Sequence, residues 1–210
     1  KKLLHEYIKI VTNSEFLLRG VSLSLLNAGL IAWVVGSPYI FIQIFDYVPQ
    51  QYGVMQLFVF SAFILGNFVS KRKDISANHE SNFIKVIYYI TIISATLLYI
   101  ASHLSWKHIE IYLLIFISIY GFGFGMGISQ MTFLTFSCVP QSKSYASAIF
   151  YTFMLGFASL ASFFVEVYYS GTVASVTKII LFCTVASIVL MSLISYFRNR
   201  RRERDYELVT

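Results

Sequence analysis

Residues 109–136 read IEIYLLIFISIYGFGFGMGISQMTFLTF, and this stretch carries no charged residue after Glu110. The hydrocarbon core of a bilayer requires about 20 apolar residues from a spanning helix. Because lipid offers no hydrogen-bond partners, a run of this length must satisfy its backbone internally as a helix. The stretch therefore predicts a membrane-spanning helix rather than a segment of a soluble domain.

The four glycines in the middle of this run could form a phosphate-binding loop or flat places where two helices touch. A phosphate loop follows a strand, is completed by Lys, Ser or Thr, and has a different glycine spacing. Here the glycines lie between apolar segments with no basic residue nearby. They form two overlapping pairs four residues apart, Gly121 with Gly125 and Gly123 with Gly127, and such pairs let membrane helices approach closely. We interpret them as packing residues.

The composition of the whole chain also indicates a membrane protein. Hydrophobic residues make up 57% of the 210 residues, charged residues only 12%, and the mean hydropathy is +0.70. A soluble domain carries about 25% charged residues. The charges gather between long apolar runs, which predicts an all-α polytopic membrane protein with six transmembrane helices. The runs cover residues 16–45, 51–70, 83–101, 109–136, 145–169 and 173–197.

Two polar segments flank the predicted bundle of residues 15–197. Residues 1–14 place Leu4, Ile8 and Val11 on one helical face, which predicts an amphipathic segment on the cytoplasmic membrane surface. Residues 198–210 form a basic tail that we interpret as a solvated stop signal facing anionic lipid. The chain begins with Lys rather than Met and shows no signal peptide, so we expect it to belong to a longer protein.

The basic residues predict the orientation in the membrane. Of the 16 Lys and Arg residues, only Lys107 and Lys178 fall on the side opposite the two termini. Because cytoplasmic loops carry the excess of Lys and Arg, both termini are predicted to be cytoplasmic. The formal net charge of +6 follows the gaps between apolar runs, and nothing resembles a nucleic-acid-binding module, so nucleic acid is not an expected partner.

The stretch VVGSPYIF predicts an irregular first span. Pro38 cannot donate a backbone hydrogen bond and crowds the carbonyl of Val34, so we expect a kink there, eased by Gly36 and Ser37. Proline is also simply tolerated in many membrane helices. Kinked, unusually long helices are typical of transporters near a central cavity.

Ionisable side chains within the spans are few, and no carboxylate falls in the middle of a span. Glu166 lies near the outer end of the fifth run and Asp46 just past the first, which favours surface positions for both. Cys138 and Cys183 lack the spacing of a metal site and are predicted to stay unpaired. The chain thus predicts no enzyme, no metal site and no cofactor. All four histidines fall in loops or at span ends: His5, His79, His103 and His108.

Two stretches resemble a known family. LIAWVVGSPYIFI (residues 30–42) and QQYGVMQLFVFSAFILGN (residues 50–67) are similar to the seventh and eighth helices of Bcr/CflA-like drug/proton antiporters of the major facilitator superfamily. The likeness resumes at SIYGFGFGMG and at Lys143 in QSKSYASA. It covers the chain as the C-terminal six-helix half of a twelve-helix protein, so that an N-terminal half would be its partner.

The resemblance implies two six-helix bundles around a central cavity in a bacterial inner membrane, embedded in membrane lipids. It implies export of small lipophilic, often cationic compounds in exchange for protons, with the proton-binding carboxylates in the N-terminal half. Helical spacing places Ile31 and Val34 on one face of the first run, and the implied positions of the second run on one face of that run. These substrate-binding positions are Ile31, Val34, Gln56, Phe60, Phe63, Met154 and Leu155.

Several alternatives stay open at this stage. The wall positions could be ordinary packing residues. The chain could belong to a transporter of another small molecule, or to a six-helix membrane protein with an assembly or interaction role. Departures from the family's pattern occur at Phe133, at Pro140 and in the loop GNFVSKRKD after the second run.

Overall fold

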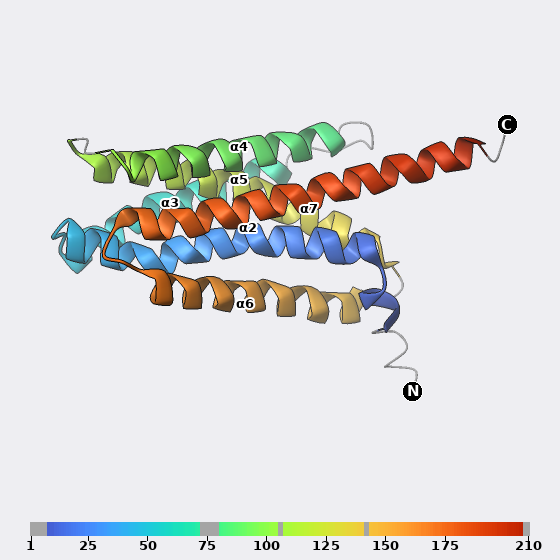
Figure 1. Ribbon diagram of the computed structural model, residues 1–210, viewed down its shortest axis with the longest axis horizontal. Helices are drawn as coiled ribbons and strands as arrows, with labels where there is room; N and C mark the ends of the chain where they lie inside the picture. Colours follow the sequence, from blue (N-terminus) through green and yellow to red (C-terminus); the bar gives the residue numbers. More distant parts are fainter. Residues whose placement is uncertain (1–7, 72–79, 105–106, 141–142, 208–210) are drawn as a thin grey trace.

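The computed structural model describes residues 8–71, 80–104, 107–140 and 143–207, and within them six helices are long and apolar enough to cross a membrane (Figure 1). The predicted all-α polytopic membrane protein is thereby confirmed. The first span is a long α-helix that continues as a short π-helix. The elements are α2 (Ser14–Pro38), η1 (Tyr39–Ile44), α3 (Pro49–Lys71), α4 (Glu80–Ala101), α5 (Ile109–Ser137), α6 (Lys143–Tyr168) and α7 (Val173–Glu207).

The two flanking segments differ in how far the structure describes them. The apolar span of α7 ends at Ile194, but the helix itself continues to Glu207, so the expected tail is largely helical. Arg and Glu are good helix formers, which agrees with this extension. At the other end, residues 8–11 are helical, with Ile8 and Val11 exposed and Ile10 buried. Leu4, the third member of the predicted apolar face, lies outside the described residues.

The six spans pack in a pattern that repeats between the two halves of the chain. Helix α2 packs against α6 and α7, and helix α5 packs against α3 and α4. Contacts between α2 and α5 and between α4 and α7 join the halves. If α2, α3 and α4 are matched in order to α5, α6 and α7, the contacts of α2 with α6 and α7 correspond to the contacts of α5 with α3 and α4. The principal contacts are therefore the same in the two halves.

The glycines of α5 allow two neighbouring helices to approach from different sides. A Cβ atom at Gly125 would overlap the carbonyl oxygen of Phe63, and one at Gly66 would overlap that of Phe122, so α3 and α5 touch backbone to backbone. On α4, Ile90 lies where a Cβ of Gly123 would come within 2.9 Å. The remaining two glycines also face one neighbouring helix each: Gly121 faces Val59 of α3, and Gly127 faces Ile87 of α4.

Buried hydroxyl groups connect four of the helices. Ser22 Oγ of α2 lies 2.6 Å from Tyr88 Oη of α4 and 2.9 Å from Ser187 Oγ of α7. Farther along, Tyr120 Oη of α5 donates to the Leu26 carbonyl at 3.0 Å and accepts from Thr184 Oγ1 at 3.3 Å. Because such groups are costly to leave unpaired away from water, these bonds fix the relative positions of α2, α4, α5 and α7.

The expected irregularity of the first span takes the form of a change in helix type. Regular α-helix runs through Pro38, and π-helix begins at Tyr39. The N–H of Tyr39 bonds to Gly36 O, and the N–H of Phe45 reaches Ile40 O, five residues back. Pi-helical turns are rare and often lie at functional sites. Asp46, with a φ of 54°, then starts the turn into α3.

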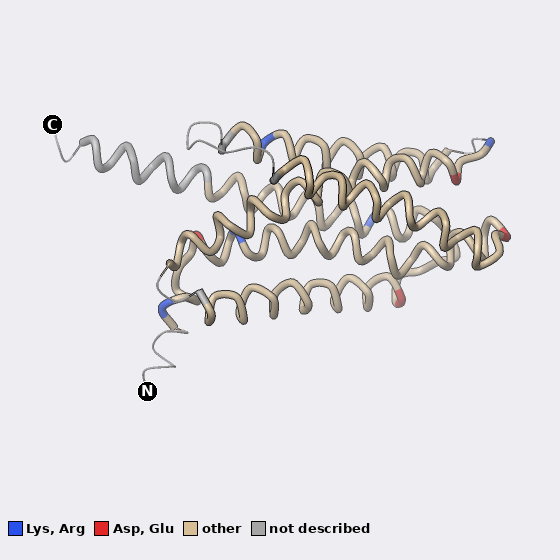
Figure 2. The backbone as a smooth tube through the Cα atoms, turned by 180° about the vertical axis from the view of Figure 1, so that it is seen from behind, with Lys and Arg blue, Asp and Glu red and all other residues tan. Residues whose placement is uncertain are grey.

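Charged residues gather toward the two ends of the described bundle (Figure 2). Arg19 is buried instead of extending to the surface, and its guanidinium donates to Glu15 at 2.7 Å. Lys1, Lys2, Arg72 and Lys73, which contribute to the predicted cytoplasmic charge, lie outside the described residues. The alternation of the spans places Lys9 and Lys85 at one end, and Asp46, Lys107, Glu110, Glu166 and Lys178 at the other.

A topology experiment tests the predicted orientation. A reporter active only in the cytoplasm should be active when inserted after Lys73, between α3 and α4, and inactive when inserted after Lys107, between α4 and α5. The excess of Lys and Arg on the first side is the physical reason. Equal activity at both positions would contradict the six-span topology.

Candidate functional site

A cluster of polar side chains lies where α2, η1 and α3 meet. Gln56 is 8% exposed, and its Nε2 donates to Ser37 Oγ at 3.1 Å. The same hydroxyl lies 3.0 Å from Tyr52 Oη and 3.5 Å from the Val34 carbonyl. The break after Pro38 and the first turns of α3 thus bring these four residues together beside the π-helix.

Two buried polar atoms of this region have no hydrogen-bond partner among the described residues. They are Nε1 of Trp33 and Oε1 of Gln56. Trp33 lies one turn before Ser37 on α2, and a buried unpaired group of this kind costs about 1–3 kcal/mol. One atom is a donor and the other an acceptor. A water molecule or a polar ligand group could therefore satisfy either of them.

The seven implied wall residues do not all share one environment. Ile31 and Val34 are half-buried on α2, and Phe63 stacks on Phe124 of α5 with ring centroids 5.7 Å apart. Phe60 lies one turn beyond Gln56 on the same side of α3 and is 43% exposed.

The two implied positions on α6 face different directions. Met154 is buried, and its carbonyl accepts a 3.4 Å hydrogen bond from Asn27 of α2. Leu155 is 69% exposed. Consecutive residues on a helix point about 100° apart. Met154 is therefore buried in the α2–α6 contact, whereas Leu155 lies on the exposed surface of α6.

Helices α3 and α6 are the most exposed of the six spans. Only 22% of each span's most apolar stretch is buried, against 56% for the span of α2 and 50% for α5. Gly53 on α3 and Gly156 on α6 have no neighbouring atom within 4 Å of a Cβ position. On α6, Thr152, Gly156 and Ser159 form an exposed row of small residues, and such rows are enriched where membrane helices pack together.

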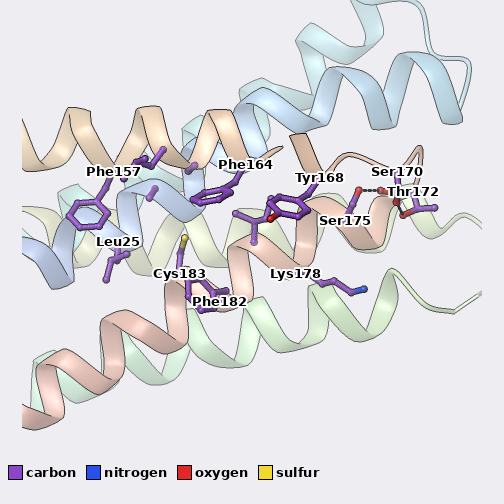
Figure 3. A pocket seen from close by; sticks show the side chains of 14 residues that line it. Leu25, Phe157, Phe164, Tyr168, Ser170, Thr172, Ser175, Lys178, Phe182 and Cys183 are labelled. Atoms are coloured by element: carbon purple, nitrogen blue, oxygen red, sulfur yellow. Dashed lines mark hydrogen bonds between the residues drawn. The ribbon is translucent and has the colours of Figure 1, made fainter. Parts of the chain in front are cut away.

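A groove of about 590 Å³ lies between α6 and α7, over α2 (Figure 3). Aromatic and aliphatic side chains form most of its wall, and Cys183 lies toward its deeper end. Its other end carries Lys178 and the hydroxyls of the α6–α7 connection. None of the seven implied wall residues lines this groove, so it is distinct from the implied cavity.

The remaining candidate side chains form no reactive cluster in the described part of the chain. Cys138 and Cys183 are not joined to each other by a disulfide bond. No group of three or more His, Cys, Asp or Glu residues among the described residues could hold a metal ion. Glu166 is exposed near the end of α6. His108 lies 3.4 Å from Glu110 in an exposed turn.

The aromatic contact at the same end of the bundle joins η1 to the end of α6. Tyr39 and Tyr169 have ring centroids 5.1 Å apart. Partial burial of Tyr169 raises the pKa of the Tyr169 phenol, and the neighbouring Tyr39 contributes a smaller effect in the same direction. This tyrosine therefore stays protonated and uncharged through neutral pH.

Sequence reasoning missed three features of the site region. Ser37 and Tyr52 are ordinary polar residues in the sequence. Tyr52 lies one turn before Gln56 on α3, and only the packing of α2 on α3 brings Ser37 to both of them. Gly66 was missed because no second glycine lies four residues before or after it to form the spacing typical of helix contacts. Compared with known protein families and with curated proteins, the sequence matches none of them.

Chemically, this region offers hydrogen-bond donors and acceptors that can bind a small molecule. It combines amide, hydroxyl and indole groups with aromatic walls, next to an irregular helix. Binding sites for small molecules have this composition, with a few placed polar groups in an apolar surround.

Proposed function

We propose that the chain is a six-helix half of a drug/proton antiporter of the major facilitator superfamily. Within that family, the stretches at residues 30–42 and 50–67 resemble those of the multidrug transporter MdfA. The complete protein exchanges protons for small lipophilic, often cationic compounds. The observation that carries the proposal is the repeated packing pattern of the two three-helix halves.

Inverted repeats are a general property of transporters. Three spans per half mean that the second half enters the membrane in the opposite direction to the first. In this arrangement α2 corresponds to α5, α3 to α6 and α4 to α7, and the principal contacts are preserved under the exchange. Repeats of this kind place a substrate site near the middle of the bilayer, at the interface between moving parts.

The irregular first span gives a second line of support. Its helix is continuous, but it changes from α to π after Pro38, and π-helical turns are rare and often lie at functional sites. Here the π-helix follows Pro38, and Gln56 and Tyr52 approach it from α3.

The exposed surfaces of α3 and α6 support a partner bundle. These are the least buried spans, and both carry a glycine with open space in front of it. Small residues on an exposed membrane-helix face favour contact with another helix over contact with lipid chains. In the proposed protein this other helix belongs to the N-terminal six-helix half.

The distribution of carboxylates agrees with proton binding by the other six-helix half. In the described spans, Glu15, Glu110 and Glu166 each lie within two residues of a span end. Proton-coupled transport needs ionisable groups inside the membrane. The proposed proton-binding carboxylates therefore belong to the other half.

Efflux from cells tests the proposed function. The intact gene is expressed in cells that lack their own exporters, and accumulation of a fluorescent lipophilic cation is followed with and without a protonophore. The protein should lower accumulation, and the protonophore should abolish the difference. If the protein reaches the membrane but a panel of lipophilic cations and neutral drugs accumulates as in empty cells, the drug-export proposal is wrong. The alternatives are then another substrate or an assembly role.

A further inference from the structure

The groove between α6 and α7 has polar groups at one end only. Along most of its length it is lined by carbon atoms, including those of Phe157, Leu160 and Phe182 (Figure 3). The exceptions cluster at the α6–α7 connection, where Ser170 and Thr172 hydroxyls lie 3.1 Å apart and the Lys178 side chain extends toward the same end. The groove therefore has an amphipathic lining with its polar end at the membrane surface.

The length of the groove matches one leaflet of a bilayer. From Phe157 to Tyr168, α6 rises by about 16 Å at 1.5 Å per residue. Half of the roughly 30 Å hydrocarbon core is about 15 Å. Tyr168 is the last residue of the apolar span of α6. Tyrosines are enriched at the membrane–water interface, so this residue marks the level of the membrane surface. The deep end of the groove, near Leu25 and Cys183, thus lies close to the middle of the membrane.

The charge at the mouth of the groove is positive. The ammonium of Lys178 is exposed, and no carboxylate of the described residues forms an ion pair with it. Lysines near span ends extend their charged group to the interface while the alkyl chain stays in the apolar region. A cationic drug would be repelled at this position, whereas the phosphate of a lipid headgroup would be attracted.

We propose that this groove binds a phospholipid, with one acyl chain between α6 and α7 and the headgroup phosphate at Lys178. Of the Ser170 and Thr172 hydroxyls, the one that does not donate to the other provides a further donor for the phosphate, whereas the Ser175 hydroxyl donates to the Thr172 carbonyl. The lipid belongs to the leaflet opposite the predicted cytoplasmic termini. This site is separate from the proposed drug cavity. Lipid binding in the groove can therefore be tested independently of the proposed drug transport.

Photo-crosslinking of the full protein in phosphatidylcholine nanodiscs tests the proposal. The two probes are phosphatidylglycerol with a diazirine at the end of an acyl chain, and a diacylglycerol with the same chains but no phosphate. Mass spectrometry locates the adducts. We expect adducts at the deep end of the groove, at Leu25, Phe157 or Cys183, above the level on the exposed surface of α4 at Ile93 and Leu97, outside the proposed interface with the other half.

The phosphate should decide the preference. Phosphatidylglycerol should label the groove about two- to five-fold more than the diacylglycerol, the range expected for one partly exposed ion pair. Lys178→Gln should remove that preference. Lys107→Gln, at another exposed lysine of the same membrane side, should leave it intact.

Three results would overturn the proposal. Groove labelling no higher than at Ile93 and Leu97 on α4 would show that the groove holds only bulk lipid. A preference that survives Lys178→Gln would remove the phosphate contact. Loss of labelling on addition of a lipophilic cation would assign the groove to a different occupant.

Discussion

Adding a single methyl group at Gly125 should destabilise the bundle strongly. In Gly125→Ala the new Cβ overlaps the carbonyl oxygen of Phe63, and neither atom belongs to a side chain that can rotate away. Overpacking typically costs 1–3 kcal/mol, and a clash with backbone should reach about 3 kcal/mol or more. The measurement is the thermal unfolding of the purified protein in detergent, where we expect a decrease on the order of 5–10 °C together with reduced folded yield.

Two further variants make this prediction specific. A Cβ at Gly20 of α2 would meet only side-chain atoms at 3.6 Å or more, which is ordinary contact, and alanine is favoured over glycine in a helix by about 1 kcal/mol. Gly20→Ala should therefore not lower the unfolding temperature. Gly66→Ala strains the same α3–α5 contact as Gly125→Ala. Once one methyl group has forced the helices apart, the second destabilises the bundle less, so the double variant should lose less stability than the sum of the two single variants. Equal stability of Gly125→Ala and Gly20→Ala would refute the close approach.

Removing the ring of Phe60 should weaken drug binding. A desolvated aromatic ring attracts a lipophilic cation by roughly 0.5–2 kcal/mol in addition to the apolar area it buries. For Phe60→Ala in the intact protein we therefore expect a loss of about 1–3 kcal/mol, or some five- to hundred-fold in Kd. Equilibrium binding of a radiolabelled lipophilic cation measures this directly. Folded yield should change little, because the ring is already 43% exposed.

Phe58 provides a matched control for this variant. It lies two residues earlier on α3, is 61% exposed, and points to nearly the opposite side of the helix. Phe60 shares its side of α3 with Gln56, which contacts α2, whereas Phe58 faces away from that contact. Phe58→Ala should therefore leave Kd unchanged. Equal losses of affinity in the two variants would assign Phe60 to ordinary surface or packing positions.

The sequence was sufficient for the spans because their signal is local. Each apolar run is long enough to cross a bilayer, and the bilayer permits only a helix for such a run. The glycine spacing of α5 likewise predicted close packing, since Gly121 and Gly125 share one face and Gly123 and Gly127 another. That α3 and α4 occupy these two faces required the structure.

The site could be predicted only in part because its geometry depends on packing between distant segments. Hydropathy cannot distinguish Met154 from Leu155, yet the α2–α6 contact buries the first and exposes the second. Arg19 has the sequence position of a surface residue but is held inside by Glu15. The α6–α7 groove has no sequence motif, since it is the space that two packed helices leave between them.

Water accessibility of α3 and α6 tests most directly whether these helices line a transport cavity. Single cysteines are placed at Phe60, Leu155 and Val185 after Cys138 and Cys183 are replaced by Ala. All three positions lie about 16–20 Å from the outer ends of their spans, so their depth in the membrane is matched. Val185 is exposed on α7, outside the proposed interface between the two halves.

Reaction of each cysteine with a membrane-impermeant maleimide is measured in the intact protein. The account predicts that the cysteines at Phe60 and Leu155 react, because a water-filled cavity reaches them, whereas the cysteine at Val185 stays unmodified in lipid. If all three are equally unreactive in the presence and absence of a transported cation, α3 and α6 face lipid. The proposed cavity would then be contradicted.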